Sequence, residues 1–117
     1  MFVLGIETSC DETAAAVIGP DGVLCDVVYT QEIHQQYGGV VPELAGRAHA
    51  EKVVSTTRAA LERAGSERPD GVGATAGPGL MGAVLVGLCF GKAVAAGWGR
   101  VPLPPEDFRP SPADFKV

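Results

Sequence analysis

The sequence is poor in basic residues, in cysteine and in long apolar runs, and each shortage excludes a class of protein. Lysine and arginine together number 9 against 14 acidic residues, which gives a net charge of −5. The basic residues are scattered, whereas neutralising the phosphates of a nucleic acid needs clustered lysine and arginine. We therefore do not expect a protein that binds nucleic acid on its own.

Cysteine occurs only 3 times, without a C-x-x-C spacing. An odd number with no short pairing argues against a disulfide framework and against a structural zinc site. No basic region precedes an apolar segment at the N-terminus, so no secretory signal is expected. These observations predict a reducing, cytoplasmic location.

The longest apolar run, residues 80–90, is short of the roughly 20 residues that a membrane-spanning helix requires. A buried helix is the better interpretation, and no membrane association is expected. With 46% hydrophobic and 20% charged residues in a chain of 117, the composition is typical of one globular domain.

The pattern along the chain predicts an α/β layer with helices packed on a sheet. Three strands form an antiparallel meander, and a helix, a weaker strand and an apolar helix follow. In chain order, these six segments are residues 2–6, 13–18, 23–29, 42–64, 71–76 and 80–96. We expect the last helix to be covered on nearly every side, and its glycines Gly87 and Gly91 to let another backbone approach closely.

The loop at residues 5–13 (GIETSCDET), between the first two predicted strands, is the most informative segment. Its hydroxyls and N–H groups suit phosphate oxygens, and its carboxylates suit a metal ion or a proton to be removed. Asp11 and Glu12 are the catalytic candidates. Because adjacent residues of an extended loop point to opposite sides, we expect Asp11 to face the ligand and Glu12 to turn away. A polar hairpin turn with solvated acids is the alternative.

A second candidate is the turn that opens the apolar helix, where Gly77, Gly79 and Leu80 could bind an anion at the helix N-terminus. A strand-to-helix turn that merely needs glycine is the alternative. Cys10 has no histidine beside it in sequence, so a small, buried, inert thiol is expected. His34 and His49 lack the i, i+4 spacing of metal ligands, and we expect His49 at the surface or at a helix cap.

Three segments together resemble one family. Residues 5–13 (GIETSCDET), 37–49 (YGGVVPELAGRAH) and 75–87 (TAGPGLMGAVLVG) are similar to the opening half of the tRNA N6-adenosine threonylcarbamoyltransferase family, once labelled O-sialoglycoprotein endopeptidase. The resemblance covers about residues 3–97. The Cys-Asp-Glu sequence of the loop favours the transferase branch over a related non-catalytic partner protein. Gly46 stands where the family usually has serine.

The resemblance implies the first lobe of a ribonuclease H-like fold of the actin and sugar-kinase superfamily, incomplete here, over residues 1–98. Residues 99–117 are then a divergent, proline-rich tail. The implied activity is transfer of a threonylcarbamoyl group from threonylcarbamoyl-adenylate to N6 of the adenosine next to the anticodon. Thr8, Ser9 and Cys10 correspond to the family's phosphate or nucleotide loop, and Asp11 lies near the reacting groups.

The family also uses one divalent metal, iron or zinc, held by histidines of a His-x-x-x-His motif and by a second lobe. No residue of this chain matches a metal-ligand position, so we expect a truncated chain that binds no cofactor and is inactive alone. The implied partners are a paralogous non-catalytic subunit, an ATPase subunit and, only in a complete complex, tRNA. The alternative is a non-catalytic module that binds partners through the exposed side of residues 42–64.

Overall fold

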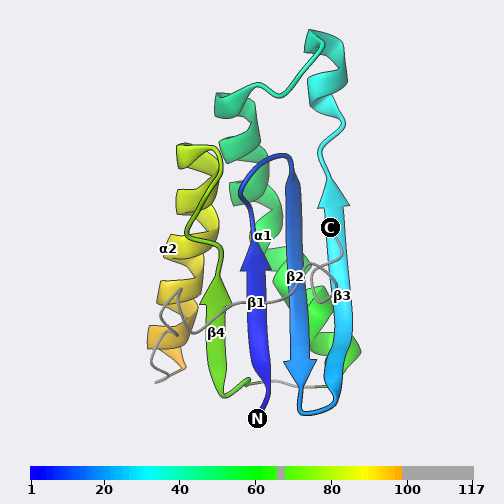
Figure 1. Cartoon of the computed structure of the whole chain (residues 1–117), viewed down its shortest axis with the longest axis vertical. Coiled ribbons are helices and arrows are strands. Elements are labelled where there is room, and N and C mark those ends of the chain that lie inside the picture. The colour runs from blue at the N-terminus through cyan, green and yellow to red at the C-terminus, as the bar shows by residue number, and fades with distance from the viewer. Residues whose placement is uncertain (66–67, 99–117) are drawn as a thin grey trace.

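The computed structural model describes residues 1–65 and 68–98, and the predicted tail at 99–117 lies outside them. Two long helices pack against one face of a single four-stranded sheet (Figure 1). The strands lie side by side in the order β3-β2-β1-β4. Their bounds are β1 Val3–Glu7, β2 Glu12–Gly19, β3 Gly22–Thr30 and β4 Gly71–Ala74.

The first three strands form the predicted antiparallel meander. Strand β3 begins directly after the turn from β2, at Gly22, whose φ of 122° is a conformation that favours glycine. Strand β4 then pairs with β1 in parallel. Because the carboxyl ends of parallel neighbours meet at one sheet edge, the loop after β1 and the loop after β4 emerge side by side (Figure 1).

Helix α1 (Pro42–Ala64) has the bounds that its apolar periodicity predicts. Proline suits the first helical turn, and Gly65 at a φ of 67° ends the helix. A short 3-10 helix, η1 (Ile33–Tyr37), precedes it, between the third strand and α1, where the sequence predicted no helix or strand. Helix α2 (Met81–Gly97) follows β4, close to its predicted range.

The core lies between the sheet and the two helices. Strand residues that point to the helical face, such as Leu4, Ile6 and Val17, pack with Val53 and Ala60 of α1. Fully burying a side chain of this size contributes about 1.5–3 kcal/mol. The core therefore fixes the register of β1 and β2, and with it the position of the loop that joins them.

Helix α2 is less covered than we expected. Met81 is 80% exposed and Leu85 is 49% exposed, and Cys89 is also exposed. The helix contacts β1, β4 and α1 on one side, and within residues 1–65 and 68–98 no element packs on the other. Gly87 and Gly91 permit a close approach, as predicted, but the approaching atoms belong to side chains: Thr8 of the loop after β1 lies against Gly87, and Ala74 of β4 lies against Gly91. Neither long helix of the described chain has the length and apolar character that crossing a bilayer requires.

Candidate active-site loop

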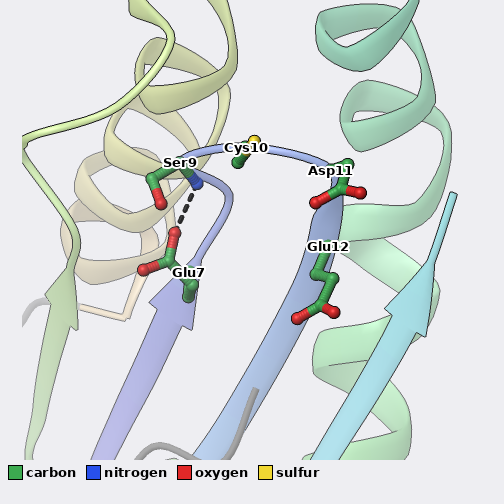
Figure 2. A pocket seen from close by; sticks show the side chains of 5 residues that line it. All are labelled: Glu7, Ser9, Cys10, Asp11 and Glu12. Carbon is green, nitrogen blue, oxygen red and sulfur yellow. Dashed lines mark hydrogen bonds between the residues drawn. The ribbon is translucent and has the colours of Figure 1, made fainter. Parts of the chain in front are cut away.

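The loop between β1 and β2 encloses a pocket at the carboxyl end of β1. Its volume is about 110 Å³. Figure 2 shows Glu7 reaching from the end of β1 toward the loop, with Glu12 lying along the start of β2. The lining residues are Glu7, Ser9, Cys10, Asp11 and Glu12. The residues that line the pocket thus carry three carboxyl groups, a hydroxyl and a thiol.

The first half of the loop is held against α2. The buried hydroxyl of Thr8 donates to the Ala83 carbonyl at 2.7 Å and accepts the Gly87 N–H at 3.0 Å. A Cβ built on Gly87 would lie 2.5 Å from the Thr8 Oγ1. Only glycine at this position therefore lets the loop approach the helix so closely.

The turn that opens α2 also contacts the loop. The Leu80 N–H donates to the Ser9 carbonyl at 2.8 Å. Gly79 has a φ of 152°, and a Cβ there would lie 2.5 Å from the same carbonyl oxygen. The glycine-rich turn is thus packed on the loop, and one N–H of the predicted anion site, that of Leu80, is already bonded within the protein.

Glu7 is a site residue to which the sequence analysis gave no role of its own. Its carboxylate accepts the backbone N–H of Ser9 through Oε1 and the hydroxyl of Thr75 through Oε2, the latter at 2.8 Å. Glu7 therefore joins the end of β1 to the loop after β4. A glutamate that ends a strand beside a Thr-Ser pair was the signal available in the sequence.

The second half of the loop is held by His49 of α1. The ring lies between the Thr13 hydroxyl, 2.8 Å from Nδ1, and the Cys10 carbonyl, 2.7 Å from Nε2. Burial lowers the pKa of His49, so the ring is neutral. We expected this histidine at the surface or at a cap, which is wrong: it is 0% exposed. The helical pattern places it on the stripe that includes Ala45 and Val53, and that position was the missed signal.

Buried Gln31, directly after β3, binds the carbonyl of Asp11, the next one along the loop. The Gln31 N–H donates to the Asp11 carbonyl at 3.0 Å, and its side-chain amide donates to the Ala45 carbonyl at 3.2 Å. His34 binds the other side of that amide at 2.6 Å and accepts the Val41 N–H at 3.0 Å. The loop, η1 and the start of α1 are thus linked through buried hydrogen bonds.

The acidic pocket perturbs two of its own groups. The pKa of Glu12 is raised, chiefly by burial and then by the negative charges of Asp11 and Glu7. Its Oε2 is buried and has no hydrogen-bond partner in the described part of the chain. The pKa of the Cys10 thiol is also raised, by partial burial of the sulfur and then by Asp11, although the residue as a whole is exposed.

The structure brings the predicted loop residues together and corrects two details. Cys10 is exposed at the crest of the loop, not buried, because the short loop leaves no layer above it (Figure 2). Asp11 and Glu12 line the same pocket instead of facing opposite sides. Asp11 lies in the loop and Glu12 begins β2, so strand alternation does not relate them. Within residues 1–65 and 68–98, no three His, Cys, Asp or Glu side chains are grouped to hold a metal ion.

Comparisons with known proteins agree with these motifs. The family model described as TsaD, tRNA N6-adenosine threonylcarbamoyltransferase, matches residues 22–104. A protein of that name from Corynebacterium diphtheriae is 51% identical over 105 residues, covering 85% of this chain and 30% of the relative. One from Chlorobium phaeobacteroides is 54% identical over 97 residues, covering 81% of this chain and 28% of the relative. The chain thus spans less than a third of the length of these relatives.

Among solved structures, YeaZ from Pseudomonas aeruginosa is similar, with a TM-score of 0.69 and 18% identity. The alignment covers 87% of this chain and 42% of that one. At this identity the likeness concerns the fold alone, and it confirms the predicted α/β architecture of a sheet with packed helices. Since the family model matches well over half of the sequence, the chain belongs to the tRNA N6-adenosine threonylcarbamoyltransferase family.

Proposed function

We propose that this chain supplies one wall of the site at which a threonylcarbamoyl group passes from threonylcarbamoyl-adenylate to N6 of the adenosine next to the anticodon. Membership of the family supports this proposal. The observation that carries it is the pocket between Glu7 and Glu12, an acidic loop held by hydrogen bonds to both helices. A site that positions reactants needs this kind of fixed backbone.

The transfer requires that a proton be removed. The adenosine amine attacks the carbamoyl carbon, the bond to the adenylate phosphate breaks, and the amine loses a proton. A carboxylate accepts this proton best when its pKa is raised toward the working pH. Glu12 has a raised pKa and an unpaired buried oxygen, so it is the proposed proton acceptor, with Asp11 beside it to orient the amine.

The leaving adenylate carries negative charge, and the loop offers polar groups for it. The Thr8 hydroxyl is already engaged with α2, so its proposed part is to hold the loop. Ser9 lines the pocket and is the proposed hydroxyl donor to phosphate, together with N–H groups of the loop. Cys10, with its raised pKa, remains a thiol and can donate only weakly.

The divalent metal of the family does not fit the described residues. The ring nitrogens of both histidines are engaged in hydrogen bonds inside the protein, and no three ligand side chains converge among residues 1–65 and 68–98. We therefore assign no step to a metal here. Iron or zinc, the adenylate, and the non-catalytic and ATPase subunits remain proposals for the complete assembly. The net charge of −5 is the reason to expect tRNA to bind only within it.

A transfer assay tests the proposal. The chain is mixed with tRNA, threonylcarbamoyl-adenylate, a divalent metal and the two proposed subunits, and modified adenosine is measured. Glu12→Gln and Asp11→Asn should each lower the rate by about 10²-fold or more, the range for losing a positioned acid or base. Glu51→Gln, which makes the same chemical change on the exposed side of α1, is the matched control. Equal rates for all four proteins would contradict the assignment.

A non-catalytic, partner-binding role is the second candidate, and the uncovered side of α2 favours it. Met81 and Leu85 expose apolar side chains there, and Val54 does so on α1. Partner proteins bind such patches. If this role is correct, the chain should bind the paralogous subunit in a sedimentation experiment, and Leu85→Glu should abolish binding. Catalysis-defective loop variants should bind normally.

A further inference from the structure

We propose that His49 is a positioning residue: it orients the peptide between Cys10 and Asp11 so that the Asp11 N–H is directed into the acidic pocket. This role rests on the proposed function of that pocket. It follows from the two hydrogen bonds of the ring, which join β2, the loop and α1. His49 itself is separated from the pocket by the loop, so it does not line the site.

The protonation of the ring follows from its partners. A backbone carbonyl can only accept, so Nε2 carries the proton and donates to the Cys10 oxygen at 2.7 Å. In the neutral ring Nδ1 is then the acceptor, and the Thr13 hydroxyl donates to it at 2.8 Å. Glu7, Asp11 and His34 are the titratable groups whose charges reach the ring. Each ring nitrogen thus has one partner, and the tautomer is determined.

The orientation of the peptide follows from its planarity. In a trans peptide, the carbonyl of one residue and the N–H of the next point in opposite directions. The Cys10 carbonyl points to α1, so the Asp11 N–H points away from α1. Cys10 and Asp11 both line the pocket. His49 therefore determines which backbone group the loop presents to a ligand.

A second hydrogen bond makes this orientation specific. The Gln31 N–H holds the carbonyl of Asp11, the next along the chain. The carbonyls of Cys10 and Asp11 are thus each bound by a different part of the fold. The peptide group that joins these two residues therefore cannot rotate freely. An apolar side chain in place of His49 would fill the same space without the cost of burying a polar ring. The hydrogen bond to the loop is what the histidine adds.

Three variants of the full chain separate positioning from packing. His49→Gln keeps an amide donor, His49→Phe keeps a buried ring without a donor, and Val53→Ala loosens the same face of α1 one turn away. Two NMR signals are measured, the ¹⁵N signals of the His49 ring and the amide signal of Asp11. Adenosine monophosphate is then added, and the changes of these signals give its binding affinity. The wild-type ring should show a protonated Nε2 and an unprotonated Nδ1.

We expect the phenylalanine variant to shift the Asp11 amide signal and to weaken binding of adenosine monophosphate by about 10-fold to 10²-fold, the range for misplacing a binding group. The glutamine variant should keep the Asp11 amide signal and the binding of adenosine monophosphate close to those of the wild type. Val53→Ala should also leave the signal and the binding near wild type, while it lowers the free energy of unfolding. If His49→Phe does not fold, a Thr13→Val variant, which removes the donor to Nδ1, should still shift the Asp11 signal and the ring tautomer.

The outcomes distinguish the two proposals. A wild-type ring protonated on Nδ1, or an Asp11 signal that responds equally to His49→Phe and Val53→Ala, overturns the positioning role. A wild-type chain that binds no adenosine monophosphate, while its Asp11 signal does respond selectively to His49→Phe, overturns the proposed use of the pocket for an adenylate. In that case the hydrogen bonds of His49 do position the loop, but for another ligand.

Discussion

The two halves of the acidic loop are held by different physical means. The first half, Thr8 and Ser9, is pressed against the backbone of α2, where glycines leave room for it. The second half, Cys10 and Asp11, is held by the side chain of His49 and by the backbone N–H of Gln31. The first attachment, to α2, combines close packing with hydrogen bonds of hydroxyl and backbone groups, none of which titrates. The second depends on which ring nitrogen carries a proton, so it can respond to the solution.

The largest effect is expected from a substitution that disrupts the packing of the first half of the loop on α2. Gly87→Ala places a Cβ 2.5 Å from the hydroxyl of Thr8, which is 1% exposed and cannot move aside. Overpacking of this kind, together with loss of the hydrogen bond to the hydroxyl, should lower the free energy of unfolding by about 2–3 kcal/mol. Urea denaturation followed by circular dichroism measures the change.

Gly82→Ala is the matched control, because it lies on the same helix with open space around its Cα. It should be neutral or stabilise the protein by up to about 1 kcal/mol, the helix-propensity gain of alanine over glycine. Two variants that destabilise equally would mean that α2 cannot accept alanine for reasons unrelated to the loop.

The next effect concerns the second half of the loop and appears in acid. An unfolded chain protonates its histidines below pH about 6.5, whereas the lowered pKa keeps folded His49 neutral further into acid. The unfolded state therefore binds more protons in that window, and the free energy of unfolding falls as the pH falls. The slope should reach up to about 1.4 kcal/mol per pH unit, and it should end at the folded pKa.

His49→Gln should flatten this slope below pH about 6.5, whereas Gly87→Ala should shift the whole stability profile down without changing its slope. The comparison is made by denaturant unfolding at several pH values. An unchanged slope in His49→Gln would mean that another group is responsible for the loss of stability in acid.

Glu12 should give a smaller change of the opposite sign. Its raised pKa means that folding favours the protonated carboxyl, so stability is full below the ordinary pKa of glutamate and declines as the pH rises through the folded pKa. Glu12→Gln removes the buried negative charge and should raise the free energy of unfolding at pH 7 by up to about 1 kcal/mol. Measured beside the transfer assay, it should be more stable and less active than the wild type. A destabilised Glu12→Gln would indicate that the carboxylate has a stabilising partner.

The sequence predicted the packing of the first half of the loop on α2 better than the hydrogen bonds of the second half. Glycines spaced one turn apart on an apolar helix indicate a close approach, and Gly87 confirms it. The position of His49 on the stripe with Ala45 and Val53 indicates burial, but it does not indicate which groups the ring binds. Only the distances to Thr13 and Cys10 reveal the role of His49.

The order of strands and helices followed from local patterns, since periodicity and turn residues are local properties. Whether a face is covered is not local. The apolar character of α2 suggested burial on all sides, yet Leu85 is exposed, because cover depends on what else packs there. In the same way, the pattern identified Asp11 and Glu12 but could not place both in one pocket.

The smallest effect is expected from a substitution at the contact between α1 and α2, the two helices that hold the two halves of the loop. Gly46 lies in the second turn of α1, and a Cβ there would lie 3.8 Å from the backbone of Gly82 in the first turn of α2, an ordinary contact. Gly46→Ala should therefore raise the free energy of unfolding by about 0.5–1 kcal/mol through helix propensity alone, measured by urea denaturation. Its Asp11 amide signal should match wild type. If the variant is instead destabilised, the helices cannot accept even one methyl group between them near the loop. The two halves of the loop would then be coupled through the contact between α1 and α2, and Gly87→Ala would disturb the bond between His49 and Cys10 as well.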